Sequence, residues 1–86
     1  MLKIYGSMQC PDCVECKNDL DRCNIEYEYF DFSDSLMNLK DFLTIRDQNP
    51  IFDEVKREGK IGIPCIVEED GTVELDWSKY VSQANA

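Results

Sequence analysis

The sequence contains no histidine and has only half as many basic as acidic residues. Eighteen aspartates and glutamates stand against nine lysines and arginines, which gives a net charge of −9. Without imidazole, the chain lacks Cys/His catalysis, histidine metal ligands and the usual general base of enzymes. The acidic balance argues against binding to nucleic acids or to anionic membrane surfaces. It favours a partner with basic patches, or simply a well-solvated surface.

Long apolar runs are also missing. No basic segment followed by an apolar stretch begins the chain, and no run is long enough to span a bilayer. We therefore expect a cytoplasmic protein that does not enter a membrane. Its 86 residues predict a single domain, residues 1–86, acting as a monomer. Five cysteines in a cytoplasmic chain indicate reactive or core thiols rather than a disulfide framework.

Two of those cysteines form the central motif, Cys-Pro-Asp-Cys at residues 10–13. The motif follows an apolar run at residues 2–5 and precedes a predicted helix. A helix N-terminus offers unpaired N–H groups and partial positive charge, which stabilise a thiolate, whereas the Asp12 carboxylate opposes it. We expect Cys10 to attack a disulfide and Cys13 to resolve the mixed disulfide. A lone Cys-x-x-Cys is a weak signal that also fits half a zinc site, but its place between strand and helix favours redox chemistry.

The hydrophobic pattern predicts an alternating order of strands and helices. One face of the first helix carries Cys13, Cys16, Leu20 and Cys23, and the second helix turns Leu36, Leu39, Phe42 and Leu43 inward. The expected elements are a strand at 2–5, a helix at 14–23, a strand at 25–32, helices at 36–46 and 51–58, a strand within 61–67, a strand at 72–75 and a helix at 76–81, with a frayed tail at 82–86.

This order is βαβα(α)ββα. A strand–helix–strand start predicts a parallel pair with a right-handed crossover. The turn signal Asp70-Gly71 predicts an antiparallel hairpin near the end of the chain. The expected fold is therefore α/β, with helices covering both faces of a four-stranded mixed sheet.

At this point the chain resembles a glutaredoxin, a member of the thioredoxin-fold superfamily, over nearly its whole length. Glutaredoxins typically carry Cys-Pro-Tyr-Cys where residues 10–13 read Cys-Pro-Asp-Cys. The segment 59–64, Gly-Lys-Ile-Gly-Ile-Pro, is similar to the family's Gly-Arg-Thr-Thr-Val-Pro loop, and the hairpin signal at 70–71 matches a third feature. The resemblance implies a thioredoxin-like fold and an enzyme that reduces protein or low-molecular-weight disulfides, without a bound cofactor or metal.

The resemblance also implies substrate-binding residues. It places a cis bond between Ile63 and Pro64 beside the dithiol, where the backbone of Ile63 pairs with the backbone of the substrate. Lys60 is expected to meet a carboxylate and Asp76 an ammonium group, and Gln9 stands close to the thiols. The electron donor implied is glutathione or a reductase.

The chain departs from the family at two places that usually hold glutathione. Residues 7–9 read Ser-Met-Gln where glutaredoxins carry a lysine shortly before the dithiol, and residues 72–76 lack the family's Gly-Gly pair. Both departures weaken the case for glutathione as the reductant, since glutathione is anionic and so is this protein.

Cys65 directly follows Pro64, and the sequence is compatible with two roles for it. It is either a buried core residue or a third thiol near the redox pair. An alternative function therefore stands beside the enzyme: a metal-binding or redox-sensing module in which Cys10, Cys13 and Cys65, with Cys16, hold zinc or an iron–sulfur centre.

Overall fold

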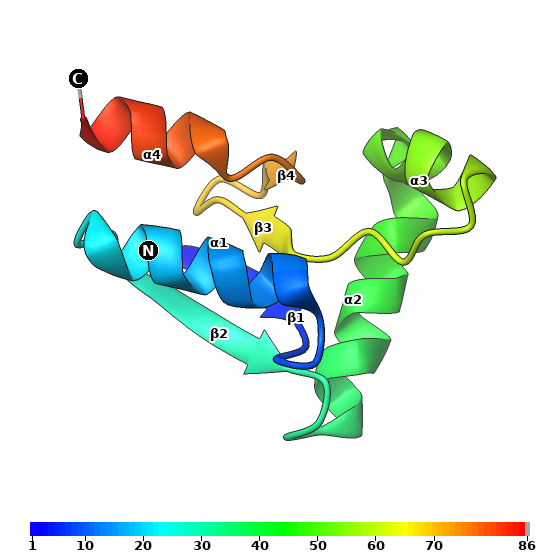
Figure 1. Cartoon of the computed structure of the whole chain (residues 1–86). Helices are drawn as coiled ribbons and strands as arrows, with labels where there is room; N and C mark the ends of the chain where they lie inside the picture. Colours follow the sequence, from blue (N-terminus) through cyan, green and yellow to red (C-terminus); the bar gives the residue numbers. More distant parts are fainter. Residues whose placement is uncertain (86) are drawn as a thin grey trace.

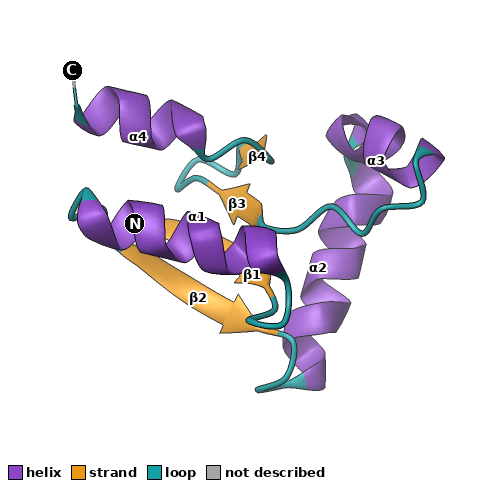
Figure 2. Ribbon diagram, in the orientation of Figure 1, coloured by secondary structure: helices purple, strands orange, loops and turns teal. Residues whose placement is uncertain are grey.

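A computed structural model describes residues 1–85 as an α/β fold built on one mixed sheet. The strands are β1 (Leu2–Gly6), β2 (Tyr27–Asp31), β3 (Cys65–Val67) and β4 (Val73–Glu74). The helices are α1 (Pro11–Arg22), α2 (Leu36–Gln48), the short 3₁₀ helix η1 (Pro50–Phe52), α3 (Asp53–Arg57) and α4 (Ser78–Ala84) (Figure 2). No helix among residues 1–85 is long and apolar enough to cross a bilayer.

The sheet has the order β2-β1-β3-β4. Strands β1 and β2 are parallel, with Ile4 opposite Tyr29, and both later pairings are antiparallel. The predicted four-stranded mixed sheet is thus confirmed, with β1 inside it. The closing turn is also where the sequence predicts it, since Gly71 takes a φ of 91°, a region that glycine enters without a steric penalty.

Two hydrophobic clusters lie on opposite faces of this sheet. Side chains alternate along a strand, so Ile4 and Ile66 face one way, and Tyr5 and Cys65 face the other. The first pair packs with Cys16 and Leu20 of α1 and with Tyr80 of α4, and the second with Phe42 of α2 and Phe52 of η1. Figure 1 shows α1 and α4 running side by side over the strands, away from α2 and α3.

Several predicted boundaries are corrected by the structure. Helix α1 begins at Pro11 rather than at residue 14, because proline suits the first turn, and α2 runs on to Gln48. The predicted helix 51–58 is split into η1 and α3, and the third and fourth strands shrink to three and two residues. Helix α4 begins at Ser78 and continues to Ala84, so most of the predicted frayed tail is helical, and Ala86 lies outside the described residues.

Two predictions of burial are also wrong. Leu36 and Leu43 were expected inside, but they are 79% and 41% exposed. At 3.6 residues per turn, they are rotated about the helix axis by about 120° and 100° from the fully buried Phe42. Both therefore lie outside the buried side of the helix. In α1, Cys23 is only partly buried, because it is the C-cap residue past the last helical turn.

Candidate functional site

Cys10 stands at the N-cap of α1, partly exposed to solvent. Its backbone is extended (φ −92°, ψ 121°), its N–H donates to the Ser7 carbonyl and its carbonyl accepts from the Val14 N–H. The side chain makes no capping hydrogen bond, so the thiol is available to a reagent from outside. At this position a thiolate benefits from the unpaired N–H groups and the dipole of a twelve-residue helix.

Cys13 lies one turn further along α1 and is completely buried. Its sulfur packs directly against Gly6, the last residue of β1. The pKa of Cys13 is raised to about 11, mainly by burial and also by the neighbouring Cys10, although the backbone of Ser7 and the Tyr29 hydroxyl act in the opposite direction. The two thiols therefore differ in their access to solvent. Cys10 can react with a substrate directly, whereas Cys13 can react only with a group that is already bonded to Cys10.

A cavity of about 400 Å³ opens beside Cys10. One wall is Ile63 and Pro64, and the bond between them is cis, as the resemblance implied. Its charged residues are Asp12 and Lys60, and Lys60 Nζ lies 3.5 Å from Glu58 Oε2. The cavity is completed by Val55, Gly59, Ile61, Gly62 and Leu75, which leaves its lining mainly aliphatic.

The loop that carries Pro64 is held in place from α2. Arg46 Nε donates to the Ile61 carbonyl and Arg46 Nη2 to the Lys60 carbonyl, both at 2.9 Å. Gly62 has a φ of 94°, and a Cβ there would lie 2.8 Å from a ring carbon of Phe52. The loop thus needs a glycine both for its backbone and for its close approach to the core, and it is fixed relative to Cys10 before any substrate arrives.

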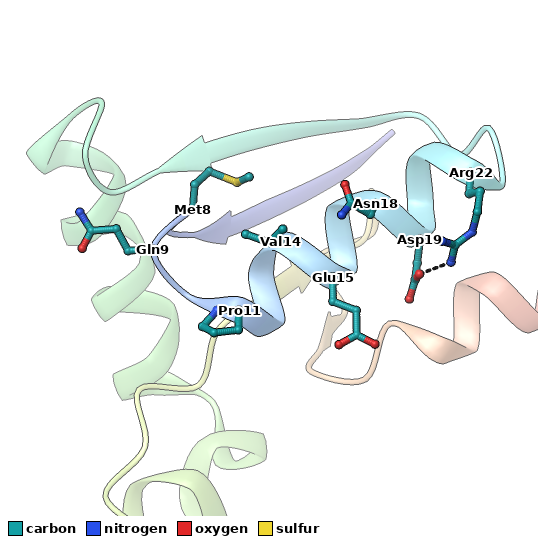
Figure 3. Close-up of a pocket in the computed structure, with 8 residues that line it drawn as sticks. All are labelled: Met8, Gln9, Pro11, Val14, Glu15, Asn18, Asp19 and Arg22. Carbon is teal, nitrogen blue, oxygen red and sulfur yellow. Dashed lines mark hydrogen bonds and ion pairs between the residues drawn. The ribbon is translucent and has the colours of Figure 1, made fainter.

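The predicted site residues divide into those that share this cavity and those that do not. Lys60, Ile63 and Pro64 line it together with Cys10. Gln9 lines a separate surface pocket of about 660 Å³ along α1, which extends toward Asp19 and Arg22 at the far end of the helix (Figure 3). Asp76 is exposed, and its carboxylate accepts hydrogen bonds from the Ser78 N–H and hydroxyl at the start of α4.

A comparison with known proteins identifies one relative. A protein of Haemophilus influenzae (strain Rd), described as an uncharacterized protein, is 40% identical over 76 residues, which is 88% of each chain. The chain belongs to the family of that protein. No protein-family model and no solved structure matches it.

The remaining cysteines lie away from one another in this family member. Cys65 is buried in the cluster with Phe42 and Phe52, and Cys16 is buried on the other face of the sheet. Burial raises the pKa of each to about 12, which keeps both as thiols. Within residues 1–85, no three cysteine, aspartate or glutamate side chains converge in a way that could hold a metal ion. Cys65 therefore stands as a core residue.

Three residues near the thiols escaped the sequence analysis. Arg46 holds the Pro64 loop, Gly6 touches Cys13, and the Tyr29 hydroxyl lies beside the same sulfur. The sequence does carry a signal for Gly6, because a glycine ends the first predicted strand shortly before the cysteine pair. Nothing in the sequence pointed to Arg46 or Tyr29, because their positions depend on how α2 and β2 pack.

Proposed function

We propose that this protein is a glutaredoxin-like thiol–disulfide oxidoreductase on a thioredoxin-like fold. The observation that carries the proposal is the cavity in which the accessible Cys10 thiol, at a helix N-terminus, faces the Ile63–Pro64 segment. The mixed sheet with helices on both faces supports the fold assignment. The chain's resemblance to glutaredoxins at residues 10–13 and 59–64 supports the family of reactions.

The reaction begins at Cys10. Its thiolate attacks one sulfur of a substrate disulfide, so that a Cys10–substrate disulfide forms and the other substrate sulfur leaves as a thiolate. Cys13 then loses its proton and attacks Cys10 Sγ, which forms the Cys10–Cys13 disulfide and releases the second substrate thiolate. Two electrons pass to the substrate, and the two cysteines are oxidised together. Glutathione or a reductase returns the electrons, in a reducing compartment such as the cytoplasm.

The lining of the cavity favours a peptide-like disulfide. Val55, Ile61 and Leu75 present aliphatic surface beside Cys10, and the positive charge of Lys60 is partly compensated by Glu58. A dicarboxylate such as glutathione finds little to balance its charge in a protein with a net charge of −9. We therefore expect protein disulfides to be better substrates than glutathione disulfide.

Replacing Cys10 tests the proposal. Cys10→Ser should lose all measurable reduction of a peptide disulfide, because serine cannot form the mixed disulfide. Cys23→Ser is the matched control, since Cys23 is a partly exposed thiol at the opposite end of the same helix and should be dispensable. Full activity in Cys10→Ser would refute the proposal.

The reduction potential and the metal content are measured on the same anaerobic sample of the whole chain. A potential between about −200 and −280 mV for the Cys10–Cys13 pair is the range of working glutaredoxins and thioredoxins. Stoichiometric zinc or iron, or a pair that never oxidises, would favour the metal-binding module instead.

A further inference from the structure

The Tyr29 hydroxyl is buried and has no hydrogen-bond partner among the residues that the structure describes. Tyr29 comes from β2, whose register places it opposite Ile4, two residues before the end of β1. A Cβ built on Gly6 would lie 2.7 Å from Cys13 Sγ and 3.1 Å from Tyr29 Oη. The hydroxyl and the sulfur therefore flank the same point under the end of β1.

An unpaired buried hydroxyl is unfavourable and is rarely found in a folded protein. In this position it costs stability while Cys13 is a neutral thiol, which is a weak acceptor. A thiolate at the same place would be a charged acceptor, and hydrogen bonds to charged groups are the stronger kind. Burial raises the pKa of Tyr29, so the hydroxyl keeps its proton and remains a donor. The hydroxyl is thus suited to the charged state of Cys13 rather than to its resting state.

Cys13 must become a thiolate within a site that opposes its ionisation. Burial is the main factor that raises its pKa, and the hydroxyl of Tyr29 is among the few groups that lower it. Among the other titratable groups, Cys10 repels a charge on Cys13, and Cys13 and Cys16 disfavour each other's ionisation, whereas Asp31 at the end of β2 raises the pKa of Tyr29 and so helps the hydroxyl to keep its proton. Tyr29 is therefore the side chain that can offset this repulsion.

We propose that Tyr29 donates a hydrogen bond to the Cys13 thiolate and so promotes the step in which Cys13 resolves the mixed disulfide. The inference rests on the proposed function. In this step Cys13 releases its proton to solvent, its Sγ bonds to Cys10 Sγ, and the substrate sulfur departs with the electron pair of the broken bond. The Tyr29 hydroxyl keeps its proton throughout and acts only as a donor.

The two sulfur-exchange steps are separated by mixing the reduced protein with a chromogenic aromatic disulfide in a stopped-flow instrument. The first coloured thiolate is released when Cys10 is captured, and the second when Cys13 resolves the adduct. All variants carry Cys23→Ser, so that the partly exposed thiol at the other end of α1 does not contribute. Tyr29→Phe removes only the hydroxyl. Tyr27→Phe is the control. Tyr27 is on the same strand, but its hydroxyl donates a hydrogen bond to the exposed Asp21 carboxylate instead of lying beside Cys13.

Tyr29→Phe should slow the second release by about 10- to 100-fold, the range for losing a hydrogen bond to a charged group, and leave the first release unchanged. Its second release should also titrate at higher pH than that of the parent. Its melting temperature should not fall, because the lost hydroxyl had no partner in the reduced protein. Tyr27→Phe should match the parent in both releases.

Equal second releases in Tyr29→Phe and Tyr27→Phe would overturn the role of Tyr29. Slowing of both releases together with a lower melting temperature would also overturn it, since that pattern indicates general structural damage. A parent protein that releases the first thiolate but never the second would refute the proposed dithiol function itself. This outcome is read from the parent, which keeps Tyr29, so it is distinct from a failure of the role of Tyr29.

Discussion

Substituting Gly6 by alanine tests the packing at the centre of the site. Gly6 ends β1, and the Cβ of an alanine there would lie 2.7 Å from Cys13 Sγ and 3.1 Å from Tyr29 Oη. The first distance is far below normal contact, so the sulfur or the strand must move. Gly6 is not among the glycines with positive φ, so the alanine backbone itself is not strained. The steric contact is therefore what destabilises the folded state.

The magnitude follows from two opposing effects. Overpacking a buried site costs about 1–3 kcal/mol. Alanine also restricts the unfolded chain, which returns about 0.4–1 kcal/mol. We expect Gly6→Ala to lower the free energy of unfolding by about 1–2 kcal/mol, and the melting temperature by about 4–8 °C for each kcal/mol. The free energy of unfolding is measured by urea denaturation followed by circular dichroism, in the presence of a reductant.

A double-mutant cycle assigns the effect to the sulfur. In a Cys13→Ala background Sγ is gone, and the remaining Cβ of residue 13 lies 3.5 Å from the new methyl group, an ordinary contact. Gly6→Ala should then cost at least about 1 kcal/mol less than in the parent. Cys16→Ala is the control background, because Cys16 is also buried on α1 but is not among the atoms nearest the new Cβ. Additivity within about 0.5 kcal/mol in the Cys13→Ala background would refute the contact.

Two further predictions concern a buried carboxylate and the loop anchor. Hydrogen bonds from the Ser33 hydroxyl and N–H hold the pKa of Asp31 below its usual value, so their stabilisation is present above the unfolded pKa of about 3.9 and is lost as the pH falls through the lower folded value. Asp31→Asn should therefore show a flatter loss of stability below about pH 4 in urea titrations, and equal acid sensitivity would contradict this. Arg46→Ala should raise the KM for a peptide disulfide by about 5-fold, because the carbonyls of residues 60–61 lose their donors. Arg22→Ala, which removes only a surface ion pair, should leave KM unchanged, and an unchanged KM in both would remove Arg46 from the site.

The order of the elements was predictable because turns are marked by residues with special backbone freedom. Asn24 ends the first helical segment with a φ of 55°, and Gly59 follows α3 with a φ of 74°. Ser35 caps α2 and accepts a hydrogen bond from the Met37 N–H. These local signals depend only on neighbouring residues, so a sequence reveals them without knowledge of the fold.

The exact faces of the helices were less predictable. Helical spacing grouped Leu36 and Leu43 with Phe42. How much of the surface of α2 is buried, however, depends on the elements that pack against it. Only Phe42 is fully buried there, against Phe52 and Phe32. The extent of burial is a property of the packed layer rather than of the helix.

The candidate site divides in the same way. Cys10 and Cys13 were found from a motif whose chemistry is carried by residue type and spacing, and Pro64 from the resemblance of residues 59–64 to a glutaredoxin loop. Gly6 and Tyr29 act on Cys13 only because β1 and β2 are parallel in one particular register. A shift of one residue would turn Tyr29 to the other face of the sheet.

The bond between Trp77 and Asp19 gives this protein a built-in optical reporter. Trp77 is the only tryptophan of the chain, and its indole N–H donates to the Asp19 carboxylate at 2.9 Å, across 58 positions of sequence. The bond joins the start of α4 to the helix that carries both thiols. Intrinsic fluorescence excited at the indole therefore reads out the docking of the final helix alone. Comparing it with a signal from the whole backbone shows whether that helix detaches before the sheet melts.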